Sequence, residues 1–224
     1  MTVQAGARTL ELDGAGEAAD LAAFLARLIH YDRAAAVRLQ AEGAALAVFG
    51  RPPSFEVLAV RTARLAGPAQ LDVTVSAGEL LEGIDESTGA LAVPEAVTGP
   101  PWAGVLPPRG GWQQVEGVPD AATMRGVVSA AVAEFRSRDE ELAPEGRTRA
   151  ARDRIGRDIW SRTLRGTELP LRAVHAAQSL GFLRPGVPVA LLSAGSWLRL
   201  RTPYGSVTVR RVSGGLGALS VGPV

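Results

Sequence analysis

The stretch GPPWAGVLPPRGGW, residues 99–112, divides the chain and decides how the rest is organised. It holds two Pro-Pro pairs, which fix φ and disfavour helix at the preceding residue, so neither a helix nor a central strand runs through it. Two of the chain's four tryptophans, Trp102 and Trp112, lie here. Tryptophan offers a large apolar area, which favours packing over a free linker. We therefore predict an ordered connector over residues 99–118, whose tryptophans pack against the lobes on either side.

Length and composition are those of a globular protein. The 224 residues suffice for one large domain or two small ones with a true core. Apolar residues make up 46% and charged residues 21%, as in ordinary soluble proteins. No apolar run approaches the roughly 18 to 20 residues of a membrane span, and residues 1–10 lack the pattern of a signal peptide. We therefore expect a cytoplasmic protein with no membrane partner.

The sequence contains few of the residue types that commonly act in catalysis. There is no cysteine, and all 24 basic residues are arginine, which with heavy Ala, Gly and Pro usage is typical of a GC-rich bacterium. Disulfides, thiolates and reactive lysines are thereby excluded. The two histidines, His30 and His175, are not spaced as metal ligands, and Gly195-Ser-Trp197 lacks the second glycine of a nucleophile elbow. We predict no catalytic residue, no metal and no cofactor, although catalysis by carboxylates alone is compatible with the sequence.

Charge is distributed unevenly along the chain. Residues 1–112 hold 8 Arg against 13 acids, residues 113–146 hold 3 against 7, and residues 147–224 hold 13 against 3. A basic third of this kind indicates an acidic ligand or partner. The alternative is that it docks on the acidic part of its own chain or of a second copy.

The part before the connector has the pattern of a helix followed by a meander. Over residues 16–30 the apolar residues recur with helical spacing. Strands are expected at 9–12, 33–40, 44–49, 55–65 and 71–75, of which 55–65 is long, with a turn at 41–43. A capping box opens a short helix at Ser76. These elements predict an antiparallel sheet covered on one face by the first helix.

The part after the connector contains three helical patterns and a hairpin. Helices are expected from Asp120 to about 142, over 148–165 and over 170–180, with a strand at 187–192 and a hairpin of 196–202 with 206–212. The predicted fold class is therefore α+β: an antiparallel sheet covered by helices, with a C-terminal helical plus β-hairpin lobe. We predict lobes at 1–98 and 119–224, either separate or integrated into one domain.

Two sets of residues are candidates for binding. Trp102, Arg109 and Trp112 lie on the stiffened connector and are of the types that anchor protein interfaces, unless both tryptophans are simply core. The second set is basic and is a candidate for binding an anion or a nucleic acid, the alternative being a solvated or self-paired face: Arg154, Arg157, Arg165, Arg172, His175, Arg199 and Arg201.

These sets support two hypotheses about function. The favoured one is a non-catalytic module for protein interaction or ligand binding, with a protein partner or self-association. The other is a nucleic-acid-binding protein, because helix, turn, helix and basic hairpin resemble a winged helix-turn-helix in element order. Arg172, His175 and Gln178 would then face the groove, with Arg199 and Arg201 on the wing. The apolar strand at 187–192 interrupts that order, which weighs against it.

Overall fold

A long β-hairpin forms the centre of the fold. The computed structural model describes residues 8–53, 55–99 and 106–211. Strand β2 (Ala36–Gly50) pairs with β3 (Leu58–Ser76) from one end to the other. The turn predicted at 41–43, and the division of β3 into two strands, are therefore wrong. A bulge takes their place: Gly43 has φ +59°, and the register shifts so that Ala44 alone lies opposite residues 65–68. Pro68, which has no N–H to donate, lies in this interruption of the ladder.

The hairpin belongs to a six-stranded antiparallel sheet that runs through both halves of the chain. Its strand order is β2-β3-β8-β7-β6-β5, with β5 Gln113–Val115, β6 Ala190–Ala194, β7 Trp197–Thr202 and β8 Gly205–Arg210. The first residues of β3 pair with β8, which joins the N-terminal to the C-terminal strands. The hairpin predicted near the C-terminus is confirmed as β7 and β8. The strand expected at 187–192 begins later, at Ala190.

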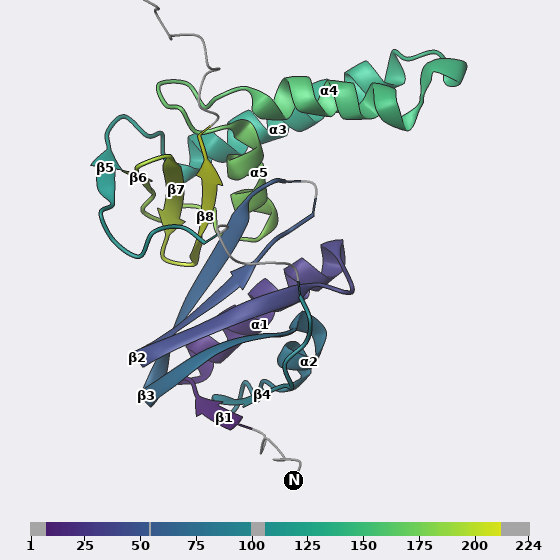
Figure 1. The fold of residues 1–224 in the computed structure, drawn as a ribbon. Coiled ribbons are helices and arrows are strands. Elements are labelled where there is room, and N and C mark those ends of the chain that lie inside the picture. The colour runs from purple at the N-terminus through teal and green to yellow at the C-terminus, as the bar shows by residue number, and fades with distance from the viewer. Residues whose placement is uncertain (1–7, 54, 100–105, 212–224) are drawn as a thin grey trace, which may run out of the picture.

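Helices lie on one side of this sheet, some packed on its strands and others packed on those helices (Figure 1). They are α1 Ala15–Tyr31, α2 Ala77–Glu82, α3 Ala121–Glu140, α4 Arg149–Ser161 and α5 Leu171–Ser179, with a 3-10 turn at Pro144–Gly146 and a small sheet of β1 Arg8–Glu11 with β4 Ala90–Val93. Alternate strand residues and all five helices contribute to one buried apolar cluster. The fold class predicted from the sequence, α+β with a helix-covered antiparallel sheet, is confirmed.

Local sequence signals place the helix starts. Ser76 accepts a hydrogen bond from the Glu79 N–H, Asp120 accepts one from Thr123, and Thr148 accepts one from Ala151. These side chains satisfy backbone donors that the first helical turn leaves unpaired. Helix α4 ends before the position predicted, because the chain is already extended at Arg162. The division into two lobes stays a prediction, although one sheet and one core include residues of both.

Helices α3 and α4 form an antiparallel pair that projects from the body (Figure 1). Arginine–carboxylate pairs connect the two helices: Arg138 with Asp158, Arg152 with Asp139 and Arg162 with Glu134. Two of these three arginines come from the basic third of the chain, and their partners on α3 come from the acidic segment before it. Part of the charge imbalance seen in the sequence is therefore compensated within the protein.

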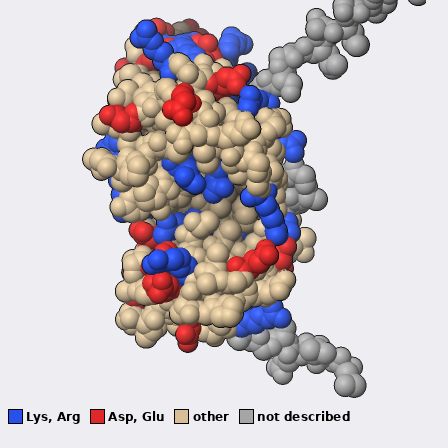
Figure 2. Space-filling model, turned by 90° about the vertical axis from the view of Figure 1, so that its left-hand side faces the viewer, with Lys and Arg blue, Asp and Glu red and all other residues tan. Residues whose placement is uncertain are grey.

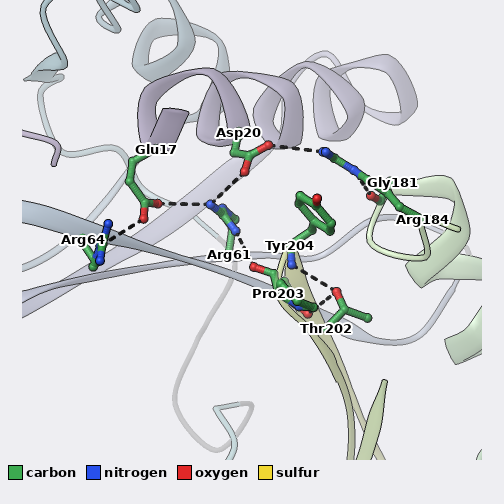
Figure 3. A network of polar contacts seen from close by, with 10 residues as sticks. Glu17, Asp20, Arg61, Arg64, Gly181, Arg184, Thr202, Pro203 and Tyr204 are labelled. Carbon is green, nitrogen blue, oxygen red and sulfur yellow. Dashed lines mark hydrogen bonds and ion pairs between the residues drawn. The ribbon is translucent and has the colours of Figure 1, made fainter. Parts of the chain in front are cut away.

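A buried arginine connects α1 to the β7–β8 turn (Figure 3). Arg61 on β3 is only 5% exposed. It donates to Glu17 and Asp20 of α1 at 3.1 and 3.4 Å and to the Pro203 carbonyl at 3.1 Å. From the other side Arg184 pairs with Asp20 at 3.2 Å and stacks over the Tyr204 ring at 3.6 Å. The two halves of the chain are therefore held together by charge as well as by the shared sheet.

We expect Arg61→Met to lower the free energy of unfolding by about 1.5 to 3 kcal/mol, because hydrogen bonds to charged groups are lost inside the protein. The matched control is Arg64→Met on the same strand, whose side chain is 73% exposed and pairs with Asp13 and Glu17. Exposed pairs contribute little, so this change should cost less than about 1 kcal/mol. Denaturant unfolding measures both, and equal losses would contradict the role assigned to Arg61.

Candidate functional site: a groove on the outer face of the sheet

The face of the sheet opposite the helices carries a second, smaller apolar cluster. Phe49, Leu58 and Val60 are buried there, packed with Ala47 of β2 and with Leu106 of the connector. Strand β2 is thus apolar on both faces around residues 45–49, because its other side chains face the helices. The described part of the connector crosses the sheet at this point. Figure 2 looks onto the β5–β7 side of the molecule and shows arginine side chains gathered around a hollow at mid-height.

Two adjoining hollows on this face form a groove. The smaller, of ≈ 300 Å³, is lined by Ala47, Phe49 and Val60 of the sheet, by residues 106–109 of the connector and by Arg199 of β7. The larger, of ≈ 560 Å³, continues along β2 and β3 past Glu42 and Asp72. They share Gln40, Ala47, Phe49, Thr62 and Arg109. We call the two together the groove. Its shape is elongated and open, with apolar side chains at the centre.

Arg199 is the charged residue of the smaller hollow that the fold leaves without an acidic partner. Its Nε donates to the Ser206 hydroxyl at 2.9 Å, and its guanidinium lies 5.8 Å from the Trp112 ring centre. Within residues 8–53, 55–99 and 106–211 no carboxylate lies within ion-pair distance of it. Desolvation, and then the neighbouring Arg201 charge, lower the pKa of Arg199. Its positive charge is therefore held at an energetic cost.

The other charged groups of the groove are paired, apart from Arg8, which is exposed. Arg109 pairs with Glu42 at 3.0 Å, and both side chains are largely exposed. At the far part of the groove Asp72 receives two hydrogen bonds from Arg38, at 2.7 and 2.8 Å, and one from Gln40. These bonds, led by that from Arg38, lower the pKa of Asp72.

The connector residues predicted to bind are placed as follows. Trp112 is half-buried, and its indole N–H donates to the Pro108 carbonyl at 3.0 Å. This bond closes a loop of the connector next to the smaller hollow, which Pro108 lines. Arg109 lines both hollows. Trp102 lies outside the described residues. The fold thus brings Arg109, Trp112 and Arg199 to one region, although the sequence places Arg199 in a different candidate set.

Of the remaining basic residues, only Arg201 lies beside this region among those described. Arg154 and Arg157 are exposed on α4, and Arg165 is exposed in the loop that follows, in the helical layer. Arg201 is exposed on β7, next to Arg199 along the strand. The predicted set of seven is therefore split between two sides of the molecule.

Helix α5 does not present a free recognition face. The His175 ring stacks on Trp160 with centres 4.3 Å apart and meets the edge of Phe55 at 5.1 Å. Arg172, with a side chain 17% exposed, lies 3.8 Å from Glu56. The β2–β3 turn thus covers Arg172 and His175, two of the three residues that would face a nucleic-acid groove. The winged-helix interpretation is not favoured, because the N-terminal half packs on this helix.

Several groove residues escaped the sequence analysis. The sequence places Phe49, Val60 and Thr62 within strands and Ser206 at the start of one, and it indicates no binding role for any of them. One signal was available: residues 45–49 are apolar at every position, which indicates a strand covered on both faces. That the second cover is the connector, and that Arg199 extends over Ser206, depends on the pairing of β3, β8 and β7.

Comparisons with known proteins concern the fold and the family. Residues 5–104 match the family described as Domain of unknown function (DUF8010), and residues 107–214 match Domain of unknown function (DUF8185). No curated protein sequence matches the chain.

Among solved structures, the chain is similar to the beta subunit from DNA polymerase of Streptococcus pyogenes, with a TM-score of 0.50 and 8% identity over 92% of this chain and 65% of that one. It is also similar to the DNA polymerase sliding clamp from Pseudomonas aeruginosa, with a TM-score of 0.47 and 12% identity over 94% of this chain and 66% of that one. The chain therefore spans less than two thirds of the length of these structures. At such identities the likeness concerns the fold alone.

Two features are absent from residues 8–53, 55–99 and 106–211. None of the helices described is long and apolar enough to cross a membrane. Within the same ranges no three of His, Asp and Glu come together as a metal site would require.

The environment of His175 makes stability depend on pH. Burial holds the pKa of His175 below its ordinary value of 6.5. The unfolded chain therefore binds the proton more readily than the folded protein, and the stabilisation present above about pH 6.5 is lost as pH falls through the lowered value. We expect the free energy of unfolding to decline on acidification from pH 7.5 to 5.5, and His175→Phe to flatten that decline.

Urea unfolding of both proteins at several pH values tests this. His30→Phe is the matched control, since it removes the chain's other histidine. If the slope persists in His175→Phe and disappears in His30→Phe, the assignment to His175 is wrong.

Proposed function

We propose that the protein is a non-catalytic protein-interaction module, which binds a segment of a partner protein in the groove on the outer face of the sheet. The observation that carries this proposal is the groove itself: an open, elongated hollow with apolar residues at its centre and an uncompensated arginine beside them. An apolar patch with a polar and arginine-rich rim is the usual composition of an interaction site.

The chemistry of the groove favours binding over catalysis. Its described lining contains two carboxylates, Glu42 and Asp72, and each is paired with an arginine. For Asp72 the hydrogen bonds from Arg38 lower the pKa, which favours the ionised form and opposes a role as general acid. His175 is stacked among aromatic rings away from this face. The groove therefore presents a shape and a charge to a ligand, and no acid–base pair of the described residues lies in it.

The structural comparison agrees with this class of function. The structure from Streptococcus pyogenes is that of the beta subunit from a DNA polymerase. A similar fold in this chain fits a protein that acts through contacts with other proteins. Self-association stays a prediction beside a separate partner.

Filling the groove should abolish peptide binding. Ala47 is half-buried on its floor, so Ala47→Trp places an indole in the hollow without removing a core side chain. The matched control is Ala133→Trp, at an exposed position of α3. Random 12-residue peptides displayed on phage are selected on the full chain, and selected peptides are then titrated by fluorescence anisotropy. We expect binding at least tenfold weaker for Ala47→Trp and unchanged for Ala133→Trp. If no selected peptide distinguishes the two variants, the groove is not an interaction site.

The nucleic-acid alternative predicts a different result. Phosphate contacts strengthen steeply as salt is lowered, so a nucleic-acid-binding protein should bind duplex DNA or RNA at about 50 mM salt. We expect no binding to either, because Arg172 and His175 are covered by the β2–β3 turn. Binding that Arg199→Ala with Arg201→Ala weakens would restore the alternative.

A further inference from the structure

We infer that the smaller hollow accepts an extended partner segment in which an aspartate or glutamate stands one or two positions from an apolar side chain, with the carboxylate bound by Arg199. This inference rests on the proposed function and names the chemistry of the partner. It follows from three features of the hollow: the unpaired charge of Arg199, the fixed position of its guanidinium, and an adjacent apolar site. The apolar site is formed by Phe49, Val60 and Leu106.

The first feature is the charge of Arg199. The arginines connecting α3 and α4 have carboxylate partners, as do Arg61 and Arg109. Arg199 has none among the described residues, yet it is half-buried and has Arg201 as a neighbour. Exposed arginines such as Arg165 are compensated by water, whereas a partly desolvated one gains more from a counter-charge. A partner carboxylate would supply that counter-charge.

The second feature is that the guanidinium is held in place. The Nε–H of Arg199 is used by the Ser206 hydroxyl, and Ser206 is only 2% exposed on β8. The Trp112 ring lies on another side of the group. An arginine fixed in this way loses little conformational freedom on binding, and its terminal N–H groups match the two oxygens of a carboxylate.

The third feature is the distance from the Arg199 guanidinium to the apolar site. Val60 on β3 is the register partner of Ser206 on β8, so the guanidinium held by Ser206 is about one strand spacing, roughly 5 Å, from Val60. Phe49 and Leu106 pack beside Val60. An extended segment advances about 3.3 Å per residue. A carboxylate on Arg199 and an apolar side chain near Val60 are therefore one or two residues apart in the partner.

The wall of the hollow also favours an extended segment. Pro107 and Pro108 line it and have no N–H to donate, so the wall is apolar and stiff. The groove continues past Ala47 into the larger hollow, which gives the segment room to run along the sheet. There Arg38 and Arg109 are already paired and Arg8 is exposed to water, so a partner carboxylate would gain most at the half-buried Arg199.

The test uses the peptides selected on the full chain. We expect them to be enriched in the pair of an acidic and an apolar residue at this spacing. For one such peptide, replacing its Asp by Asn should weaken binding to the wild type roughly tenfold or more, because a charged hydrogen-bonded pair is lost. Binding to Arg199→Gln should be equally weak for both peptides, so that the two changes are not additive. Arg165→Gln is the matched control and should behave as the wild type.

The outcomes separate this inference from the proposed function. Peptides that Ala47→Trp excludes but that show no acidic preference would overturn the inference and leave the interaction site standing. Absence of any groove-dependent peptide would overturn both. Displacement of a bound peptide by an equal concentration of oligonucleotide would assign Arg199 to a nucleic acid and overturn the inference. Thermal melts of Arg199→Gln establish that a loss of binding is not a loss of fold.

Discussion

The pairing of β3 with both β2 and β8 is the constraint on which the rest of the structure depends. Strand β3 pairs with β2 along its length, and its first residues also pair with β8. The N-terminal hairpin and the C-terminal strands therefore form one sheet. The same strand carries Arg61, which donates hydrogen bonds to Glu17 of α1 and to the Pro203 carbonyl in the β7–β8 turn. Loss of this pairing would separate the helices from their common core, because no other described strand pair joins the two halves of the six-stranded sheet.

The shared sheet also explains why the groove lies where it does. A sheet with helices on one face leaves the other face to water or to another cover. Here the connector covers part of it, and Leu106 packs on Phe49, Leu58 and Val60. The cover is incomplete, so apolar side chains line a groove beside Arg199. The connector therefore both joins the halves of the chain and shapes the surface proposed to bind a partner.

Charge compensation within the chain accounts for much of the basic third. Arg152 and Arg162 pair with acids of α3, Arg184 pairs with Asp20 of α1, and Arg211 pairs with Glu168. These partners are mostly distant in sequence, which is why composition alone could not tell a self-docking arginine from one that binds a ligand. Among the described arginines of residues 147–211, what distinguishes Arg199 is its combination of partial burial with the absence of a described carboxylate partner.

The sequence by itself determined the local elements. The apolar spacing of α1, the caps at Ser76, Asp120 and Thr148, and the β7–β8 hairpin follow from interactions within a few residues, so each could be predicted. The tertiary structure decided the rest: the bulge at Gly43 that keeps β2 continuous, the covering of His175 by Phe55, and the meeting of Trp112 with Arg199. These depend on which strands pair and which helix faces are packed. That choice is set by the burial of the whole apolar core, which no local window of sequence contains.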